Sequence, residues 1–203
     1  MEEKNKILGF AEERFLSEGF HKTTMDDIAA ELHTSKKTIY KYFPSKEMLL
    51  KLVFKTFTQR VKNEIEPIVE GKLHAIEKIV AVTTVLKKVA MKMSDRWLND
   101  VRIHQPSIWK DIEEFRAQMI SKNISKIFIQ GIEEGYIIDA PPVIMITIFM
   151  NTVRSIINPE FIMNNSFSAS EAVEHTFKIL LNGMFTDKGR EAYNKLISKK
   201  ARE

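Results

Sequence analysis

Apolar residues recur with helical spacing along most of the chain, and the clearest run lies near its N-terminus. Four of them fall at i, i+3, i+4 and i+7 and so share one helical face, namely Met25, Ile28, Ala29 and Leu32. Thr24 precedes this run and Asp27 lies three residues further on, which is the spacing of a capped helix start. The pattern predicts a short helix that begins just after Thr24.

A second short helix is predicted after the polar break at residues 33–35. Ser35 is a good N-cap, and Ile39 and Phe43 then share a face. Pro44 disfavours helical geometry at the residue before it, so the helix should end there. Two short helices joined by about three residues form a helix-turn-helix, whose second helix can lie in a DNA major groove.

The polar side of the second helix carries hydrogen-bond donors suited to DNA, namely Lys36, Lys37, Thr38, Tyr40 and Lys41. Residues 33–62 contain eight basic groups and one acidic group, a local charge of +7. A run of charge alone is more often a solvated surface than a nucleic-acid site. Combined with the helix-turn-helix spacing, however, this local positive charge favours a polyanionic partner.

Residues 5–62 resemble the DNA-binding domain of the TetR family of bacterial transcriptional regulators. The matching residues follow the family's order and spacing: Phe15, Gly19-Phe20, Thr23-Thr24, Asp27-Ile28-Ala29, Ser35-Lys36, Thr38-Ile39-Tyr40-Lys41-Tyr42-Phe43 and Ser45-Lys46-Glu47-Met48-Leu49. One departure is in the turn, where the family usually has Gly-Val and this chain has His33-Thr34. Because a turn glycine supplies a positive φ, we expect a small local strain at His33.

The resemblance implies ten DNA-binding residues: Thr24, Thr34, Ser35, Lys36, Lys37, Thr38, Tyr40, Lys41, Tyr42 and Lys46. Lys46, Tyr40 and Thr24 are expected to contact phosphates, and residues 36–38 to lie nearest the base edges. The expected partner is a double-stranded, palindromic operator.

The flanking pattern predicts two further helices around this motif. Residues 3–18 form one, which Gly19 ends as a C′ residue. Another begins at Ser45 and is expected to end at or just before Pro67. We therefore expect a DNA-binding domain with its linker helix at 1–66 and a regulatory domain at 67–203.

The rest of the chain also reads as helices, so the predicted fold class is all-α, with about nine or ten helices. The N-terminal domain is a three-helix helix-turn-helix domain, and the C-terminal domain is helical and implied to bind a ligand and to dimerise. The expected later helices are 73–93, 97–104, one long helix at 107–134 ended by Gly135, 141–158, a helix capped by Ser168 or Ser170 and extending to about residue 185, and a weakly held helix within 186–203.

The helix at 141–158 is apolar almost all round, which predicts burial on several sides. The resemblance implies a homodimer in which the last two main helices of each subunit form a four-helix interface. Burial of these apolar residues within one chain would also explain the pattern. The expected interface residues are Met150, Val153, Ile157, Val173, Phe177, Leu180, Leu181 and Met184.

A cavity for a small apolar or amphipathic effector is expected in the regulatory half. Its candidate residues are Trp97, His104, Trp109, Phe115, Met119, Met145, Phe149 and Arg154. Met and aromatic residues at helical spacing more often form core than a ligand site. His104 and Arg154 are more informative, because polar groups among apolar neighbours need partners.

The composition and the absence of known motifs argue against several classes of function. With no Cys, disulfides and thiolate metal sites are excluded, and the five His are scattered, so no metal site is expected. No phosphate loop or catalytic motif occurs, which argues against an enzyme, and no cofactor is expected. The N-terminus lacks a secretory pattern and the apolar run at 143–150 is too short to span a bilayer, so we expect a soluble, cytoplasmic protein without a membrane partner.

The sequence therefore predicts a dimeric transcriptional regulator, most simply a repressor that a ligand releases from its operator. One alternative is a helical DNA-binding scaffold or nucleoid-associated protein without a ligand switch. Another is a helical enzyme that carries a vestigial helix-turn-helix. A closed core in the second domain would favour the scaffold, and an open cavity would favour the ligand sensor.

Overall fold

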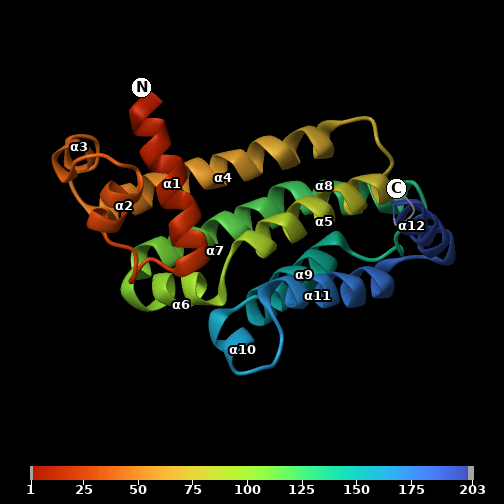
Figure 1. Cartoon of the computed structure of the whole chain (residues 1–203). Helices are drawn as coiled ribbons and strands as arrows, with labels where there is room; N and C mark the ends of the chain where they lie inside the picture. Colours follow the sequence, from red (N-terminus) through yellow and green to blue (C-terminus); the bar gives the residue numbers. More distant parts are fainter. Residues whose placement is uncertain (1, 201–203) are drawn as a thin grey trace. The chain divides into compact units, whose positions relative to one another are not determined.

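The computed structural model describes residues 2–200, and these residues are almost entirely helical (Figure 1). Within them no β-strand forms, and Ile137 and Phe185 make one isolated bridge. The all-α prediction is thus confirmed. The elements are α1 (Glu2–Glu18), α2 (Met25–Glu31), α3 (Lys36–Tyr42), α4 (Lys46–Glu70), α5 (Ala75–Lys92), α6 (Asp95–His104), α7 (Pro106–Met119), the π-helical turn η1 (Ile120–Ile124), α8 (Ser125–Glu133), α9 (Pro142–Ile156), α10 (Pro159–Met163), α11 (Ala169–Met184) and α12 (Asp187–Lys200).

The helices group into two compact units. The first contains the chain up to Arg60 together with Lys92–Ile112, and the second contains Val61–Met91 together with the chain from Glu113 onwards. This grouping differs from a single boundary after residue 66, because α6 packs on the N-terminal helices. The backbone N–H of Ser94, the N-cap of α6, donates to the carbonyl oxygen of Leu16 in α1 at 2.9 Å.

The helix boundaries follow the local chemistry of the sequence. Thr24, Ser35 and Ser168 accept backbone hydrogen bonds as N-caps, as the pattern predicts. Gly19 and Gly135 follow helices with φ of 96° and 73°, the left-handed conformation that glycine adopts without a Cβ penalty. These residues confirm the predicted ends of α1 and α8.

The expected end of the linker helix at Pro67 is wrong, because α4 continues to Glu70 and contains that proline. Proline disrupts a helix by losing one hydrogen bond and crowding the preceding turn. Here it lies in the last turn, and contacts from neighbouring helices stabilise the three residues after it. The buried Lys78 donates to the carbonyl oxygen of Val69 at 2.6 Å, and Lys126 pairs with Glu70 at 2.6 Å.

The long helix expected at 107–134 is also corrected. The chain does remain helical from Pro106 to Glu133, but the π-helical turn η1 interrupts it at Ile120–Ile124. In addition, the structure contains the short helix α10, which the sequence pattern does not predict. Asn158 caps it by accepting from the backbone N–H of Glu160 at 2.9 Å.

The core of the second unit contains a row of three aromatic rings, one each from α8, α9 and α11. The Phe128 and Phe149 rings meet edge to face with centroids 5.6 Å apart, and Phe149 meets Phe177 in the same way at 5.1 Å. Helices α9 and α11 pack against each other (Figure 1). Among the described helices none is long and apolar enough to cross a membrane.

Candidate nucleic-acid interface

The start of α2 is fixed by a reciprocal pair of hydrogen bonds. Thr24 Oγ1 accepts from the backbone N–H of Asp27 at 3.1 Å, and Asp27 Oδ2 accepts from the backbone N–H of Thr24 at 2.8 Å. The Thr24 hydroxyl also donates to the same carboxylate at 2.7 Å. These hydrogen bonds lower the pKa of the Asp27 carboxyl. The bond with the Thr24 side chain has the largest effect, and the bond from the Thr24 backbone N–H has the next largest. This capping box sets the orientation of α2 relative to the turn before it.

The turn between α2 and α3 has the strained geometry that its sequence predicts. His33 is exposed and has φ 52°, in the left-handed region that non-glycine residues rarely occupy. Backbone bonds hold it there, because His33 N–H donates to Ala30 O at 3.1 Å and Thr34 N–H donates to Ala29 O at 2.9 Å. The turn therefore forms with histidine in place of glycine.

We expect His33→Gly to raise the free energy of unfolding by about 0.5–1 kcal/mol, because glycine removes the Cβ strain but adds chain entropy when unfolded. Urea denaturation followed by circular dichroism measures this change. Thr34→Gly is the matched control: its φ is not positive, so this change should destabilise the protein. A loss of stability in His33→Gly would contradict the strain argument.

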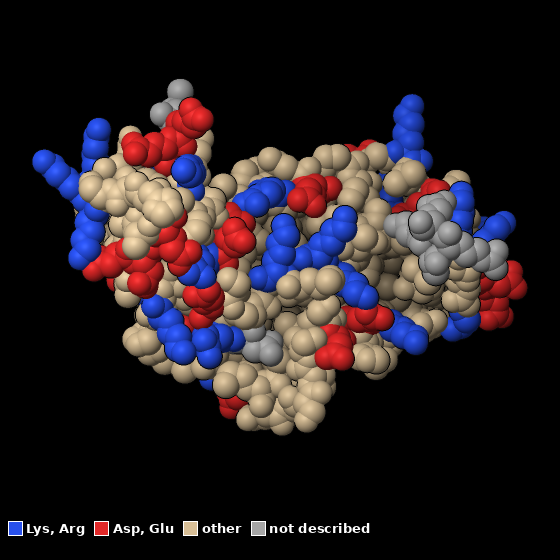
Figure 2. Space-filling model, in the orientation of Figure 1, with Lys and Arg blue, Asp and Glu red and all other residues tan. Residues whose placement is uncertain are grey.

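One face of helix α3 is buried, and the opposite face is exposed to solvent. Ile39 is fully buried against the domain core, and Ser35 caps the helix by accepting from the Thr38 N–H at 3.0 Å. The side opposite Ile39 is exposed and carries Lys36, Lys37, Tyr40 and Lys41. Figure 2 shows Lys and Arg side chains projecting at the position that α3 occupies in Figure 1, next to acidic side chains. This is the arrangement that a recognition helix needs.

Several of the predicted contact residues have partners within the protein. Lys36 pairs with Asp26 on α2, and this bond raises the pKa of Lys36. The Tyr42 hydroxyl donates to Glu3 at 3.0 Å, which raises the pKa of that phenol. Lys37 has no ion-pair partner among residues 2–200. Of the two lysines at the start of α3, Lys37 is therefore more available than Lys36 to bind DNA.

Lys46 lies away from the exposed face of α3, at the start of α4. Its ammonium group donates to His21 O at 3.3 Å and lies 4.2 Å from the centroid of the Phe20 ring. Partial burial lowers its pKa. Lys46 therefore joins α4 to the turn between α1 and α2, next to the capping box at Thr24.

Sequence reasoning missed a set of contacts that fixes this same turn, which we call the α6 contact. Asp100 Oδ2 accepts from the backbone N–H of His21 at 3.0 Å, and the His104 ring stacks on that of His21 with centroids 4.5 Å apart. A Cβ on Gly19 would collide with the Asp100 carboxylate and lie 2.8 Å from Arg96 Cγ. Residues about 80 positions apart meet here (79 for the Asp100–His21 bond), so no local pattern indicates the contact.

The eight predicted ligand-pocket residues are divided between the two units. Trp97, His104 and Trp109 belong to the first unit, where Trp97 is buried and His104 forms part of the α6 contact. The remaining five belong to the second unit. The side chain of Arg154 is 77% exposed and pairs with Glu113 at 3.3 Å.

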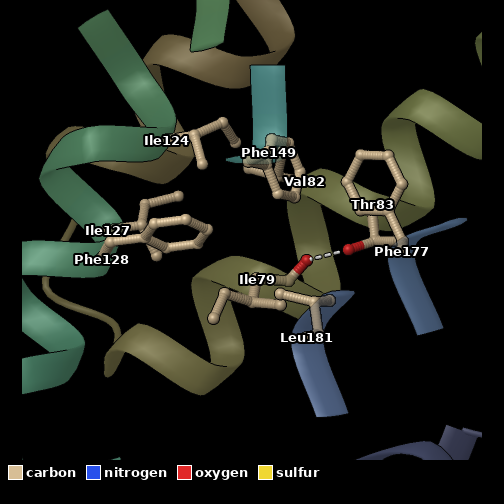
Figure 3. Close-up of a pocket in the computed structure, with 9 residues that line it drawn as sticks. All are labelled: Ile79, Val82, Thr83, Ile124, Ile127, Phe128, Phe149, Phe177 and Leu181. Atoms are coloured by element: carbon tan, nitrogen blue, oxygen red, sulfur yellow. Dashed lines mark hydrogen bonds between the residues drawn. The ribbon is translucent and has the colours of Figure 1, made fainter. Parts of the chain in front are cut away.

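A small cavity lies in the second unit, and of the eight predicted residues only Phe149 lines it (Figure 3). Its volume is about 10 Å³, room for roughly one water molecule. The lining is apolar except for Thr83, whose hydroxyl donates to Ile79 O. The nine lining residues are Ile79, Val82, Thr83, Ile124, Ile127, Phe128, Phe149, Phe177 and Leu181.

Most of the residues expected at a dimer interface lie in the core of their own chain. The buried ones are Val153, Val173, Phe177, Leu181 and Met184, so they are not available to a partner, whereas Met150, Ile157 and Leu180 are partly exposed. The apolar residues that point outward from α9 and α11 are Val143, Ile144, Ile148 and Ile179, which are 69%, 53%, 49% and 71% exposed.

Comparisons with known proteins agree with this arrangement. Residues 7–53 match the family described as bacterial regulatory proteins, tetR family. YvaF, an uncharacterized HTH-type transcriptional regulator of Bacillus subtilis, is 24% identical over 170 residues, which are 83% of this chain and 89% of that protein.

Two solved structures show a similar fold. A TetR-family transcriptional regulator from Marinobacter aquaeolei has a TM-score of 0.77 at 20% identity, and the match covers 98% of both chains. The ketosteroid transcriptional regulator KstR2 of Mycobacterium tuberculosis has a TM-score of 0.60 at 19% identity, covering 91% of this chain and 96% of that one.

Proposed function

We propose that this chain, a member of the TetR family of bacterial transcriptional regulators, is a dimeric repressor that binds a palindromic operator and is released by a small effector. The observation that carries the proposal is the capped pair α2–α3. The buried Ile39 fixes α3 against the core, and the opposite side presents Lys37, Tyr40 and Lys41. A repressor of this kind competes with polymerase for the promoter.

The two-fold assembly is proposed through the outward apolar residues of α9 and α11. Ile144, Ile148 and Ile179 are large, apolar and exposed in a single chain, and the two helices that carry them pack together. A two-fold axis would pair this surface with its own copy. It would also place two α3 helices in successive major grooves, about 34–36 Å apart.

Transmission of the effector signal is proposed through α4. The second half of this helix is bound to its neighbours by Lys122, which pairs with Glu66 at 3.0 Å, and by Lys78, which bonds to Val69 O. Its first residue, Lys46, contacts the turn before α2. An effector releases DNA only if it binds the DNA-competent state less tightly than another state.

A second candidate function is a DNA-binding scaffold without a ligand switch. The small volume of the cavity favours it, because a cavity with room for one water must enlarge before it can hold an effector. A screen of apolar and amphipathic compounds for thermal shifts, followed by operator titrations with each hit, separates the two. Compounds that stabilise the protein but leave operator affinity unchanged would favour the scaffold.

DNA selected by the protein from a random pool tests the proposed roles of two lysines. We expect Lys37→Ala to weaken binding to the selected site by about 1–3 kcal/mol, roughly 5–150-fold, and to relax base preference, because this side chain lies nearest the base edges. Lys46→Ala should weaken all sequences alike and reduce the salt slope by about 1.

Fluorescence anisotropy titrations on selected and unrelated duplexes measure both effects. Lys195→Ala, which removes one exposed charge from α12 in the second unit, is the control and should bind as the wild type does. Wild-type affinity and preference in both Lys37→Ala and Lys46→Ala would contradict the proposed interface.

A further inference from the structure

Asn123 is a buried amide whose carbonyl end has no partner. It lies in η1 and only 1% of its surface is exposed. Its Nδ2 donates to the sulfur of Met119 at 3.4 Å, which is a weak acceptor, and no donor within residues 2–200 reaches its Oδ1. An unpaired buried oxygen costs stability, so its presence in a core points to a role other than folding.

Asn123 is not one of the nine lining residues, but it belongs to the helical turn η1 that contributes to the wall of the cavity. The next residue, Ile124, lines that cavity, and Ile127 lines it from one turn further along the same helical side (Figure 3). The lining includes no charged side chain, and the hydroxyl of Thr83 is already donated to Ile79 O. A molecule in this space would therefore meet mostly apolar surface, with the Thr83 hydroxyl oxygen as an acceptor in the lining and Asn123 Oδ1 as an unpaired acceptor in η1.

The π-helical turn η1, which contains Asn123, contributes Ile124 to the wall of the cavity. Such turns are rare, hold one more residue than an α-turn, and recur at functional sites. At about 10 Å³ the cavity admits a molecule larger than water only when part of its wall moves. Because η1 is irregular and adjoins the cavity, it is the segment whose rearrangement would enlarge the space with the least loss of regular helix.

We propose that Asn123 Oδ1 is the polar anchor of the effector site, and that it accepts a hydrogen bond from an uncharged, largely apolar molecule with one hydroxyl or amide N–H. This inference rests on the proposed function and names the chemical class of its effector. A charged effector is disfavoured, because burying a charge without a partner is costly and the cavity offers none.

The test uses the full chain with two probes of equal composition, 1-octanol and 1-methoxyheptane, which differ in that only the alcohol donates a hydrogen bond. Titration followed by thermal shift should give the wild type roughly 3–10-fold higher affinity for 1-octanol, the ratio expected for one hydrogen bond. In Asn123→Leu the preference should disappear or reverse. Equal binding of the two probes by the wild type, or binding of neither, would overturn the proposal.

The stability of the variant gives an independent readout. Leucine has the same branching and the same number of side-chain heavy atoms as asparagine and removes the unpaired oxygen, so the melting temperature of Asn123→Leu should be unchanged or higher. Gln118→Leu, which removes an exposed amide from α7, is the matched control and should keep the preference for 1-octanol. A marked fall in the melting temperature of Asn123→Leu would mean that the amide is structural, and would contradict the proposed anchor.

Operator affinity separates this inference from the proposed function. If the wild type binds operator DNA but shows no preference between the probes, the anchor fails and the regulator stands. If the wild type prefers 1-octanol and yet keeps its operator affinity when the alcohol is bound, the site stands and the proposed switch fails.

Discussion

Ile148→Glu should convert the proposed dimer into monomers and reduce operator affinity roughly 10²–10⁴-fold. Ile148 is 49% exposed in the single chain, so a carboxylate there is compatible with the fold of the subunit. In the proposed interface the same carboxylate would be buried without a partner, which opposes association. The loss of affinity is expected because two linked recognition helices bind far more tightly than one, by about 10²–10⁴-fold.

Light scattering after size-exclusion chromatography measures the assembly, and anisotropy titration measures the affinity. Met91→Glu is the matched control, since Met91 is 68% exposed on α5 and lies outside the proposed interface. It should remain dimeric with wild-type operator affinity. A wild type that is monomeric at micromolar concentration, or an Ile148→Glu variant that stays dimeric, would contradict the proposed assembly.

Gly19→Ala should lower the free energy of unfolding by about 2–5 kcal/mol, the sum of left-handed strain and overpacking. Gly19 has φ 96°, and a Cβ at this position would collide with the Asp100 carboxylate that accepts the His21 N–H. The α6 contact would be displaced, and with it the turn that leads to the capping box at Thr24. Operator affinity should fall together with stability.

Thermal denaturation followed by circular dichroism measures the effect, at about 2–4 °C per kcal/mol for a chain of this size. Gly9→Ala is the internal control. Gly9 lies within α1, and a Cβ there would meet nothing within 4 Å. Because alanine favours helix over glycine by about 0.5–1 kcal/mol, Gly9→Ala should stabilise the protein. Equal effects of the two substitutions would contradict the importance of the α6 contact.

The parts of the fold that the sequence predicts correctly depend on neighbours in the chain. The caps at Thr24 and Ser35, the strained turn at His33 and the glycine helix ends depend on bonds that span a few residues. Residue types with a steric or hydrogen-bonding reason for their place can be recognised from the sequence alone.

The features that sequence reasoning missed depend on long-range packing. Asp100 reaches His21 only when α6 packs on the N-terminal helices, so neither residue stands out in the chain. Periodicity identifies the buried face of α9 and α11 but not the elements that cover it. Val153 and Phe177 face the core of their own chain, while Ile148 on the opposite side remains exposed.

The same limit applies to the effector site. The sequence pattern predicts a pocket lined by aromatic and Met residues, and Phe149 is the one of them that lines the small cavity of the second unit. Whether an apolar residue borders a cavity depends on how several helices fill space, which a linear pattern does not contain. The unpaired oxygen of Asn123 is equally invisible in the sequence, because the burial of a side chain and its hydrogen-bond partners depend on the packing around it.

We propose above that this protein reads DNA through two symmetry-related copies of α3. Selection of bound duplexes from a random pool, followed by sequencing and by mass measurement of the complex, tests this mode of recognition. We expect an inverted repeat whose half-sites are about one helical turn apart, bound by two chains, with the repeat weakened or lost for Lys37→Ala. Enrichment of no sequence, or of a single half-site bound by one chain, would rule out recognition by two copies of α3.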